Sequence, residues 1–294
     1  MDRRTFGLQV MCALAAATPL AARTQQENWG QGLAARLREI EAGTQGRLGV
    51  AILDTATGAL QGHRLDERFP MCSTFKWLAA AYVLKRVDDG QERLDRRIRY
   101  GREVLLPHSP VTQRHAGGEG MTLAGLCEAT ITISDNAAAN LILGTYGGPQ
   151  GLTRFVRTLG DEVTRLDRTE PELNESLPDD PRDTTTPRAM SLLLRKALLG
   201  DALSPASRAQ LVQWMQATRT NANRLGAGLP KGWRLGSKTG TGARGSTNDV
   251  GVYWPPGRAP IVVSVYVTGT QAELPVRERA IAQVAGLVTA SRKG

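Results

Sequence analysis

A serine and a lysine three positions apart, Ser73 and Lys76, open an apolar run that continues from Trp77 to Val87. If this run is a helix that begins near Ser73, the spacing places the hydroxyl and the ammonium on one face, about one turn apart. Serine is a poor nucleophile at its own pKa, but a lysine in a desolvated cleft can accept or relay its proton. The alternative is a solvated serine cap followed by a surface lysine, which is the more common meaning of an isolated Ser-x-x-Lys.

A second polar cluster is the triplet Ser134-Asp135-Asn136. Its hydroxyl could deliver a proton, its carboxylate could accept buried structural hydrogen bonds, and its amide could hold a substrate carbonyl. The alternative is an ordinary helix-capping turn, since serine, aspartate and asparagine all favour that position.

A third cluster lies on a stretch of small residues from Gly236 to Gly242 that reads as a strand. Lys238, Thr239 and Thr241 would place a cation and two hydroxyls on a strand edge that glycines let a ligand approach closely, which suits a ligand carrying a carboxylate. The alternative is a glycine-bounded strand without a ligand. Phosphate binding is less apt, because the stretch does not end a glycine-rich loop before a helix.

These motifs occur in the order Ser-x-x-Lys, Ser-Asp-Asn and Lys-Thr-Gly, with gaps of about sixty and one hundred residues. In this order they resemble the motif set of the penicillin-recognising serine hydrolases. A fourth stretch, residues 165–183, resembles the omega loop of class A β-lactamases, which holds the deacylating water with a glutamate and an asparagine. By motif position these residues are Glu170 and Asn174. The stretch could otherwise be a solvated acidic loop.

The resemblance extends from about Leu33 to the C-terminal helix, and it implies hydrolysis of the β-lactam amide of penicillins and cephalosporins through an acyl-serine, without metal or cofactor. It also implies a cis bond between Glu170 and Pro171, and an ion pair of Arg168 with Asp183 that closes the loop. The implied catalytic residues are Ser73, Lys76, Ser134 and Glu170. The implied substrate-binding residues are Asn136, Asn174, Arg224, Lys238, Thr239, Thr241 and His108.

For acylation, the resemblance implies that Ser73 attacks and that its proton passes to Lys76 or, through a water, to Glu170, a choice that stays open. The backbone N–H groups of Ser73 and Thr241 would form the oxyanion hole. Ser134 would then protonate the leaving nitrogen.

Lys238 would assist Ser134 and, together with Thr239 and Thr241, would hold the substrate carboxylate. For deacylation, Glu170 and Asn174 would position and activate the water that attacks the ester.

Some positions depart from the best-known family pattern. Thr247 stands where many members carry an arginine, and Arg224 matches the alternative place for that cation, so we expect Arg224 to anchor the carboxylate. His108 stands where the family often has a gating aromatic residue, and a plain loop histidine is the alternative.

The two cysteines beyond the N-terminal segment match single ends of disulfides found in some members. Ala81 occupies the position opposite Cys127, and Gly242 occupies the position opposite Cys72. We therefore expect both thiols to be free and largely buried.

The formal charge of +9 arises from scattered lysines and arginines, and aromatic residues make up only 5% of the 294 residues. This composition disfavours a nucleic-acid surface and favours a general attraction for small anions. The histidines His63, His108 and His115 lack metal-binding spacing, so no zinc site is expected.

The first 22 residues combine a charged head containing Arg3-Arg4 with a short alanine-rich run from Leu8 to Ala22. This pattern predicts a cleaved export signal, twin-arginine or general secretory, because the run is too short to span a membrane as a helix. We expect a periplasmic or secreted monomer without a stable membrane anchor.

Strand patterns occur at residues 48–54, 59–64, 233–238, 249–254 and 261–268, whereas residues 69–216 show mostly helical patterns. A helix is also expected at 277–290. These positions predict an α/β plus α fold, in which residues 27–66 and 217–294 form an antiparallel sheet flanked by helices and residues 67–216 form an inserted all-helical domain. The site would lie at their junction.

Two other functions share the three motifs. A penicillin-binding DD-peptidase would act on cell-wall peptides, and a β-lactam sensor domain would be acylated without turnover. The cell-wall enzyme would lack the Glu170-x-x-x-Asn174 loop, and the sensor would need a membrane-spanning segment beyond the short signal.

Overall fold

The computed structural model describes residues 20–290, so most of the expected signal, residues 1–22, lies outside the described residues. A five-stranded antiparallel sheet runs in the order β2-β1-β9-β8-β7. Its strands are β1 (Arg47–Asp54), β2 (Leu60–His63), β7 (Arg234–Thr241), β8 (Thr247–Trp254) and β9 (Ile261–Thr268). Strands from both ends of the chain therefore share one sheet, as expected.

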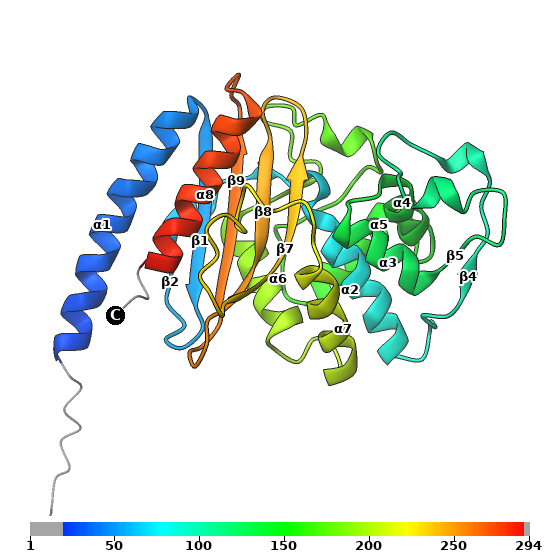
Figure 1. Cartoon of the computed structure of the whole chain (residues 1–294), viewed down its shortest axis with the longest axis horizontal. Coiled ribbons are helices and arrows are strands. Elements are labelled where there is room, and N and C mark those ends of the chain that lie inside the picture. Colours follow the sequence, from blue (N-terminus) through cyan, green and yellow to red (C-terminus); the bar gives the residue numbers. More distant parts are fainter. Residues whose placement is uncertain (1–19, 291–294) are drawn as a thin grey trace, which may run out of the picture.

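Helices cover both faces of this sheet (Figure 1). α1 (Leu20–Thr44) and α8 (Leu274–Ala290) pack side by side on one face, and α6 (Pro187–Leu198) packs on the other. All eight residues of β9 are buried, because a strand covered on both faces exposes neither set of its side chains. α7 (Pro205–Gln216) packs along the edge strand β7.

The helical part is built around α2 (Phe75–Asp88), which packs against α3 (Leu123–Thr132), α4 (Asn136–Gly144), α5 (Gly148–Thr158) and α7. Short 3₁₀ turns are η1 (Cys72–Thr74), η2 (Arg102–Val104), η3 (Thr112–Arg114) and η4 (Glu172–Asn174). Two-residue strands pair β3 (Phe69–Pro70) with β6 (Thr184–Thr185) and β4 (Arg97–Ile98) with β5 (Met121–Thr122). Pairings this short leave no periodicity in the sequence and were therefore not predicted from it.

Side-chain caps explain where several helices begin. Thr122, Asp135, Thr186 and Ser204 each accept a hydrogen bond from the backbone N–H three residues later, at the start of α3, α4, α6 and α7. α6 and α7 also carry proline in their first turn, where the missing N–H is not needed.

The architecture confirms the predicted fold class, a sheet formed from both chain ends with helices inserted between them. Between residues 20 and 290, no helix has the length and apolar character needed to cross a membrane.

Candidate active site

The structure places Ser73 where the sheet meets the helical part. Ser73 lies in η1, directly before α2, and η1 packs against β7 and β8. A Cβ atom on Gly240 of β7 would lie 2.8 Å from the Met71 carbonyl oxygen and 3.2 Å from the Ser73 nitrogen. Only glycine therefore lets the β7 backbone pass this close to the serine. The preceding residue, Cys72, holds a left-handed φ of 45°.

One carboxylate oxygen joins the serine to the lysine. The Ser73 hydroxyl donates to Glu170 Oε1 at 3.1 Å, and Lys76 Nζ forms an ion pair with the same oxygen at 3.0 Å. Lys76 also donates to the Ser134 carbonyl at 2.8 Å and to Asn136 Oδ1 at 2.6 Å. We call Ser73, Lys76, Ser134 and Glu170 the reaction centre.

Burial and charge act in opposite directions on Lys76. Its side chain is fully buried, and burial lowers its pKa by disfavouring the ammonium, whereas the Glu170 carboxylate raises it. Four acceptors surround Nζ, the carbonyl and hydroxyl oxygens of Ser134, Asn136 Oδ1 and Glu170 Oε1, so all three hydrogens of an ammonium can be used. This arrangement holds the lysine next to the serine's hydrogen-bond partner.

Ser134 lies between two buried lysines. Its hydroxyl oxygen accepts from Lys238 Nζ at 3.0 Å and from Lys76 Nζ at 3.3 Å. The residue has a φ of 66°, an unusual conformation for serine that directs the turn before α4.

Asp135 fixes this turn by hydrogen bonds to the segment at Val111 and Thr112 and to the start of α4. Its buried carboxylate caps α4 and accepts hydrogen bonds from the backbone of Val111 and Thr112 and from the Thr112 hydroxyl. The triplet therefore combines the two readings given from the sequence. Asp135 is a helix cap, and Ser134 and Asn136 contact Lys76 in the site.

The omega loop carries Glu170 into the site. The Glu170-Pro171 bond is cis, and Arg168 Nε donates to Asp183 Oδ2 at 2.6 Å, so both features expected for the loop are confirmed. Asn174 in η4 donates from Nδ2 to Glu170 Oε2, which leaves Oε1 to Ser73 and Lys76.

Asn140 of α4 holds the Glu170 backbone at both polar groups. Its Oδ1 accepts from the Glu170 N–H at 3.0 Å, and its Nδ2 donates to the Glu170 carbonyl at 2.8 Å. No motif in the sequence identified Asn140, although its position four residues after Asn136 on one helix could have indicated it.

The opposite side of the site is the edge of β7, with Lys238, Thr239, Thr241 and the neighbouring Arg224, which we call the cationic wall. Arg224 is 5% exposed. Its guanidinium donates to the Gly240 carbonyl at 2.9 Å and to Thr241 Oγ1 at 2.8 Å. The Thr241 hydroxyl oxygen accepts from Arg224, so its own hydrogen can point elsewhere.

Thr220 completes this wall and was also missed by the sequence analysis. Its hydroxyl forms a hydrogen bond with the Thr239 hydroxyl at 2.5 Å. No motif marks Thr220, because the loop between α7 and β7 that carries it meets β7 only in the folded chain.

Lys238 is fully buried among like charges. Burial is the main cause that lowers its pKa well below the usual value, and the nearby Lys76 and Arg224 charges lower it further. The Asp249 and Glu170 carboxylates oppose this shift. The wall therefore brings two cationic groups, Lys238 and Arg224, close together, and the two carboxylates offset part of the cost of charge on Lys238.

A cleft of about 340 Å³ lies between the reaction centre and the cationic wall. It brings together most of the predicted site residues, and its lining is Ser73, His108, Ser134, Asn136, Asn174, Thr220, Arg224, Thr239, Gly240 and Thr241. Lys76, Glu170 and Lys238 lie directly behind this lining, bonded to Ser73 and Ser134.

His108 lines this cleft. Its Nε2 lies 2.8 Å from the Ile133 carbonyl oxygen, and its own carbonyl accepts from the Asn136 N–H at 3.0 Å. The histidine is thus attached to the turn that carries Ser134.

The two cysteines of the described chain, Cys72 and Cys127, are free and buried, which confirms the prediction made from the sequence.

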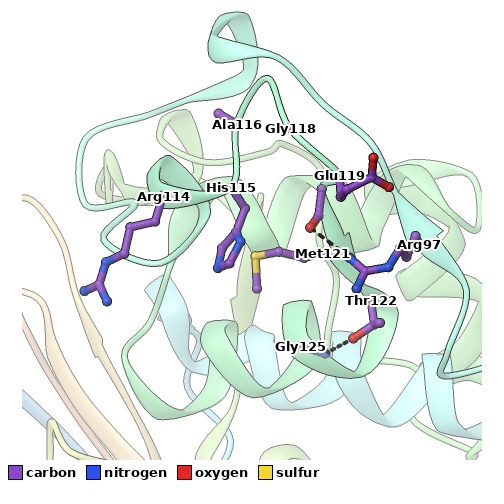
Figure 2. Close-up of a pocket in the computed structure, with 10 residues that line it drawn as sticks. Arg97, Arg114, His115, Ala116, Gly118, Glu119, Met121, Thr122 and Gly125 are labelled. Atoms are coloured by element: carbon purple, nitrogen blue, oxygen red, sulfur yellow. Dashed lines mark hydrogen bonds between the residues drawn. The ribbon is translucent and has the colours of Figure 1, made fainter.

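A second cavity, of about 510 Å³, lies in the helical part between the segment before β5 and the start of α3 (Figure 2). Arg97, Arg114 and His115 line it, but none of the predicted site residues does. Figure 2 shows the Arg114 side chain pointing away from the other labelled side chains. Because its polar groups do not converge, this cavity is a poorer candidate for chemistry than the cleft.

Comparison with known proteins agrees with the geometry of the cleft. The profile of the Beta-lactamase enzyme family matches residues 32–291. The chain is 48% identical to Beta-lactamase L2 of Stenotrophomonas maltophilia, over 83% of this chain and 81% of that protein. It is 46% identical to Beta-lactamase OXY-2 of Klebsiella oxytoca, over 86% and 87%.

Solved structures agree as well. An ancestral (GNCA) class A β-lactamase shares 63% identity at a TM-score of 0.87, covering 88% of this chain and 99% of that one. The putative class A β-lactamase PenP from Rhodopseudomonas palustris shares 58% identity with the same TM-score and coverage. The chain therefore belongs to the β-lactamase enzyme family, as a class A serine β-lactamase.

Proposed function

We propose that the cleft hydrolyses the β-lactam amide of penicillins and cephalosporins in two steps, through an ester on Ser73, and so confers resistance to these compounds. The observation that carries this proposal is the shared oxygen Glu170 Oε1, which contacts both the Ser73 hydroxyl and Lys76 Nζ. A carboxylate in this position can serve the attack of the serine and, later, the attack of water on the ester.

In acylation, the Ser73 oxygen attacks the lactam carbonyl carbon as its proton leaves toward Glu170 Oε1, with Lys76 stabilising the carboxylate. The direct 3.1 Å contact supports Glu170 as the first proton acceptor. Lys76, on the same oxygen, can take the proton onward if it is neutral when substrate is bound. The negative charge on the carbonyl oxygen would be held by the backbone N–H groups of Ser73 and Thr241.

Collapse of the tetrahedral intermediate breaks the C–N bond, and the nitrogen must gain a proton as it leaves. Ser134 is suited to supply it, because its hydroxyl oxygen accepts from Lys76 and Lys238 and its hydrogen is therefore available to donate. Lys76 or Lys238 can then return a proton to Ser134.

The substrate carboxylate would bind the cationic wall. Thr239 and Thr241 line the cleft with hydroxyls, and Arg224 and Lys238 supply positive charge behind them. Asn136 and His108, on the opposite rim, would contact the substrate side chain.

In deacylation, Glu170 removes a proton from a water that Asn174 helps to orient, and the water attacks the ester carbonyl. The hydrogen bond from Asn174 to Glu170 Oε2 supports this pairing. The same loop disfavours the two alternatives, because a DD-peptidase would lack the Glu170-x-x-x-Asn174 loop and a sensor has to retain its acyl group.

Turnover of the chromogenic cephalosporin nitrocefin by the purified protein tests the proposal. We expect many turnovers per enzyme and no lasting acyl adduct by intact mass. Acylation of Ser73 at one equivalent without release would contradict hydrolysis and favour the sensor or DD-peptidase.

We further propose that the chain acts after export, in the periplasm or outside the cell, and as a monomer. The charged head and short apolar run of residues 1–22 support export. N-terminal sequencing of the exported protein and size-exclusion chromatography with light scattering would test these two points.

A further inference from the structure

A buried carboxylate lies behind the cationic wall. Asp249 of β8 is fully buried and is the cross-strand partner of Thr239, one of the residues that line the cleft. Its Oδ2 accepts a hydrogen bond from the Leu225 N–H at 3.1 Å. Among the described residues, Oδ1 has no partner at hydrogen-bonding distance, although the Ser237 hydroxyl is close enough to favour the charged form. A buried oxygen with so few partners needs a reason.

The hydrogen bond to Leu225 fixes the turn that presents Arg224. The Leu225 N–H donates to Asp249, and the Leu225 carbonyl accepts from the Tyr253 hydroxyl at 2.6 Å, so both polar groups of this buried residue are held by β8. Arg224 directly precedes it. Its guanidinium uses four N–H groups on Gly240, Asn248, Thr241 and Glu278. Of the five that arginine has, one is left for a ligand.

Asp249 also balances charge. Burial raises its pKa to about 6, so the carboxylate is ionised at neutral pH, and it then opposes the fall in the pKa of Lys238. On α8, which packs against β8, Glu278 pairs with Arg224 and Arg277 donates to Thr247, and the partner of Asp249 on β9 is Val265. The charged and titratable groups that interact with Asp249 itself are Arg224, Lys238 and Tyr253. Those around Lys238 are Lys76, Arg224, Asp249 and Glu170.

We propose that Asp249 is a positioning residue for substrate binding: its negative charge keeps Lys238 protonated, and its hydrogen bond to Leu225 holds the turn that presents Arg224. This inference rests on the proposed function, because it assigns the cationic wall to the substrate carboxylate. Without Asp249, the buried cations have one fewer counter-charge, and Lys238 is the one that can lose its proton.

The test compares pH profiles of kcat/KM for nitrocefin between pH 5 and 10 in the wild type, D249N, D249E and a control. D249N keeps an oxygen that can accept from Leu225 but removes the charge, and D249S is a second charge-free variant if D249N does not fold. D249E keeps the charge. The matched control is D161N, because Asp161 is also buried, accepts from two backbone N–H groups and has an Oδ2 without a partner in the described part of the chain, but lies outside the cleft.

We expect the alkaline limb of kcat/KM to move to lower pH by about one unit in D249N, which is roughly tenfold lower kcat/KM on that limb, with a smaller change near pH 6. The loss should be mainly in KM. D249E should keep the alkaline limb of the wild type even if its KM is raised at every pH, and D161N should match the wild type throughout.

A charge-free variant whose kcat/KM falls equally at every pH, or keeps the wild-type alkaline limb, would overturn the inference and leave Asp249 a structural role. That result is distinct from failure of the proposed function, in which the wild type itself does not turn over nitrocefin.

Discussion

The two sides of the cleft handle buried charge differently. In the reaction centre, the positive Lys76 meets the negative Glu170 at 3.0 Å, so the charges are largely balanced within the protein. On the cationic wall, Lys238 and Arg224 carry positive charge toward the cleft, and Asp249 and Glu278 compensate it from behind. A balanced centre can move protons at little electrostatic cost, whereas an incompletely balanced wall attracts an anion.

From this difference we expect that substitutions in the reaction centre lower kcat, because they affect the chemical steps. Substitutions in the cationic wall should raise KM, because they affect substrate binding. The largest effect is expected for Ser73→Ala, which removes the nucleophile and should lower kcat for nitrocefin by about 10⁴-fold or more. Thermal unfolding should remain close to that of the wild type, since only one hydroxyl is lost. A variant with near-normal turnover would exclude Ser73 as the nucleophile.

Glu170→Ala should lower turnover by roughly 10³-fold and trap the acyl-enzyme, because the water loses its base while the serine can still be acylated with the help of Lys76. Intact mass after mixing with a penicillin should show one adduct. Glu172→Ala is the matched control, since Glu172 is an exposed carboxylate in the same loop. Fast release of the adduct in Glu170→Ala would count against the role assigned to Glu170.

Arg224→Ala should raise KM for carboxylate-bearing substrates by about tenfold to hundredfold, with a smaller change in kcat, because a charge-assisted hydrogen bond and a nearby cation are removed. Arg224→Lys should recover part of the loss, since the charge returns without the forked geometry. Steady-state kinetics measures both constants. A decrease in kcat with unchanged KM would contradict this role and would indicate that Arg224 acts in the chemical steps.

Arg168→Ala is expected to have the smallest effect on rate. Asp183 is 1% exposed and accepts from Arg168 Nε, but it keeps the N–H groups of Asp167 and Arg168. Because Arg168 is partly exposed, the free energy of unfolding should fall by only about 2 kcal/mol. Deacylation should slow more than acylation, since the loop carries Glu170. Denaturant unfolding measures the change in stability, and single-turnover mass spectrometry measures the rates of acylation and deacylation. An unchanged ratio of these two rates would contradict the expected slowing of deacylation.

Much of the fold could be predicted from the sequence. The expected strand at residues 261–268 matches β9, and the expected helix at 277–290 lies within α8, Leu274–Ala290. Both carry strong, continuous apolar patterns. The two-residue strands and the short 3₁₀ turns could not be predicted, because so few residues carry no period and their geometry depends on neighbours distant in the chain.

The site divides in the same way. Ser73 and Glu170 could be identified because each belongs to a motif of adjacent residues, whereas Thr220, Asn140 and Asp249 belong to none. Their importance comes from contacts across 19, 30 and 24 positions of the chain, with Thr239, Glu170 and Leu225 respectively. Local pattern can at most place Asn140 on the helix face of Asn136, and it cannot indicate any of the three distant partners.

The sequence by itself determined which groups are present for chemistry and the order in which they occur, since side-chain chemistry and local motif spacing belong to the chain. Only the tertiary structure decided which atoms meet: that one oxygen of Glu170 contacts both Ser73 and Lys76, and that Arg224 contacts Thr241 at the edge of β7. The physical reason is that hydrogen bonds, burial and charge compensation depend on distances in space. Those distances arise when the helical part packs against a sheet built from both ends of the chain.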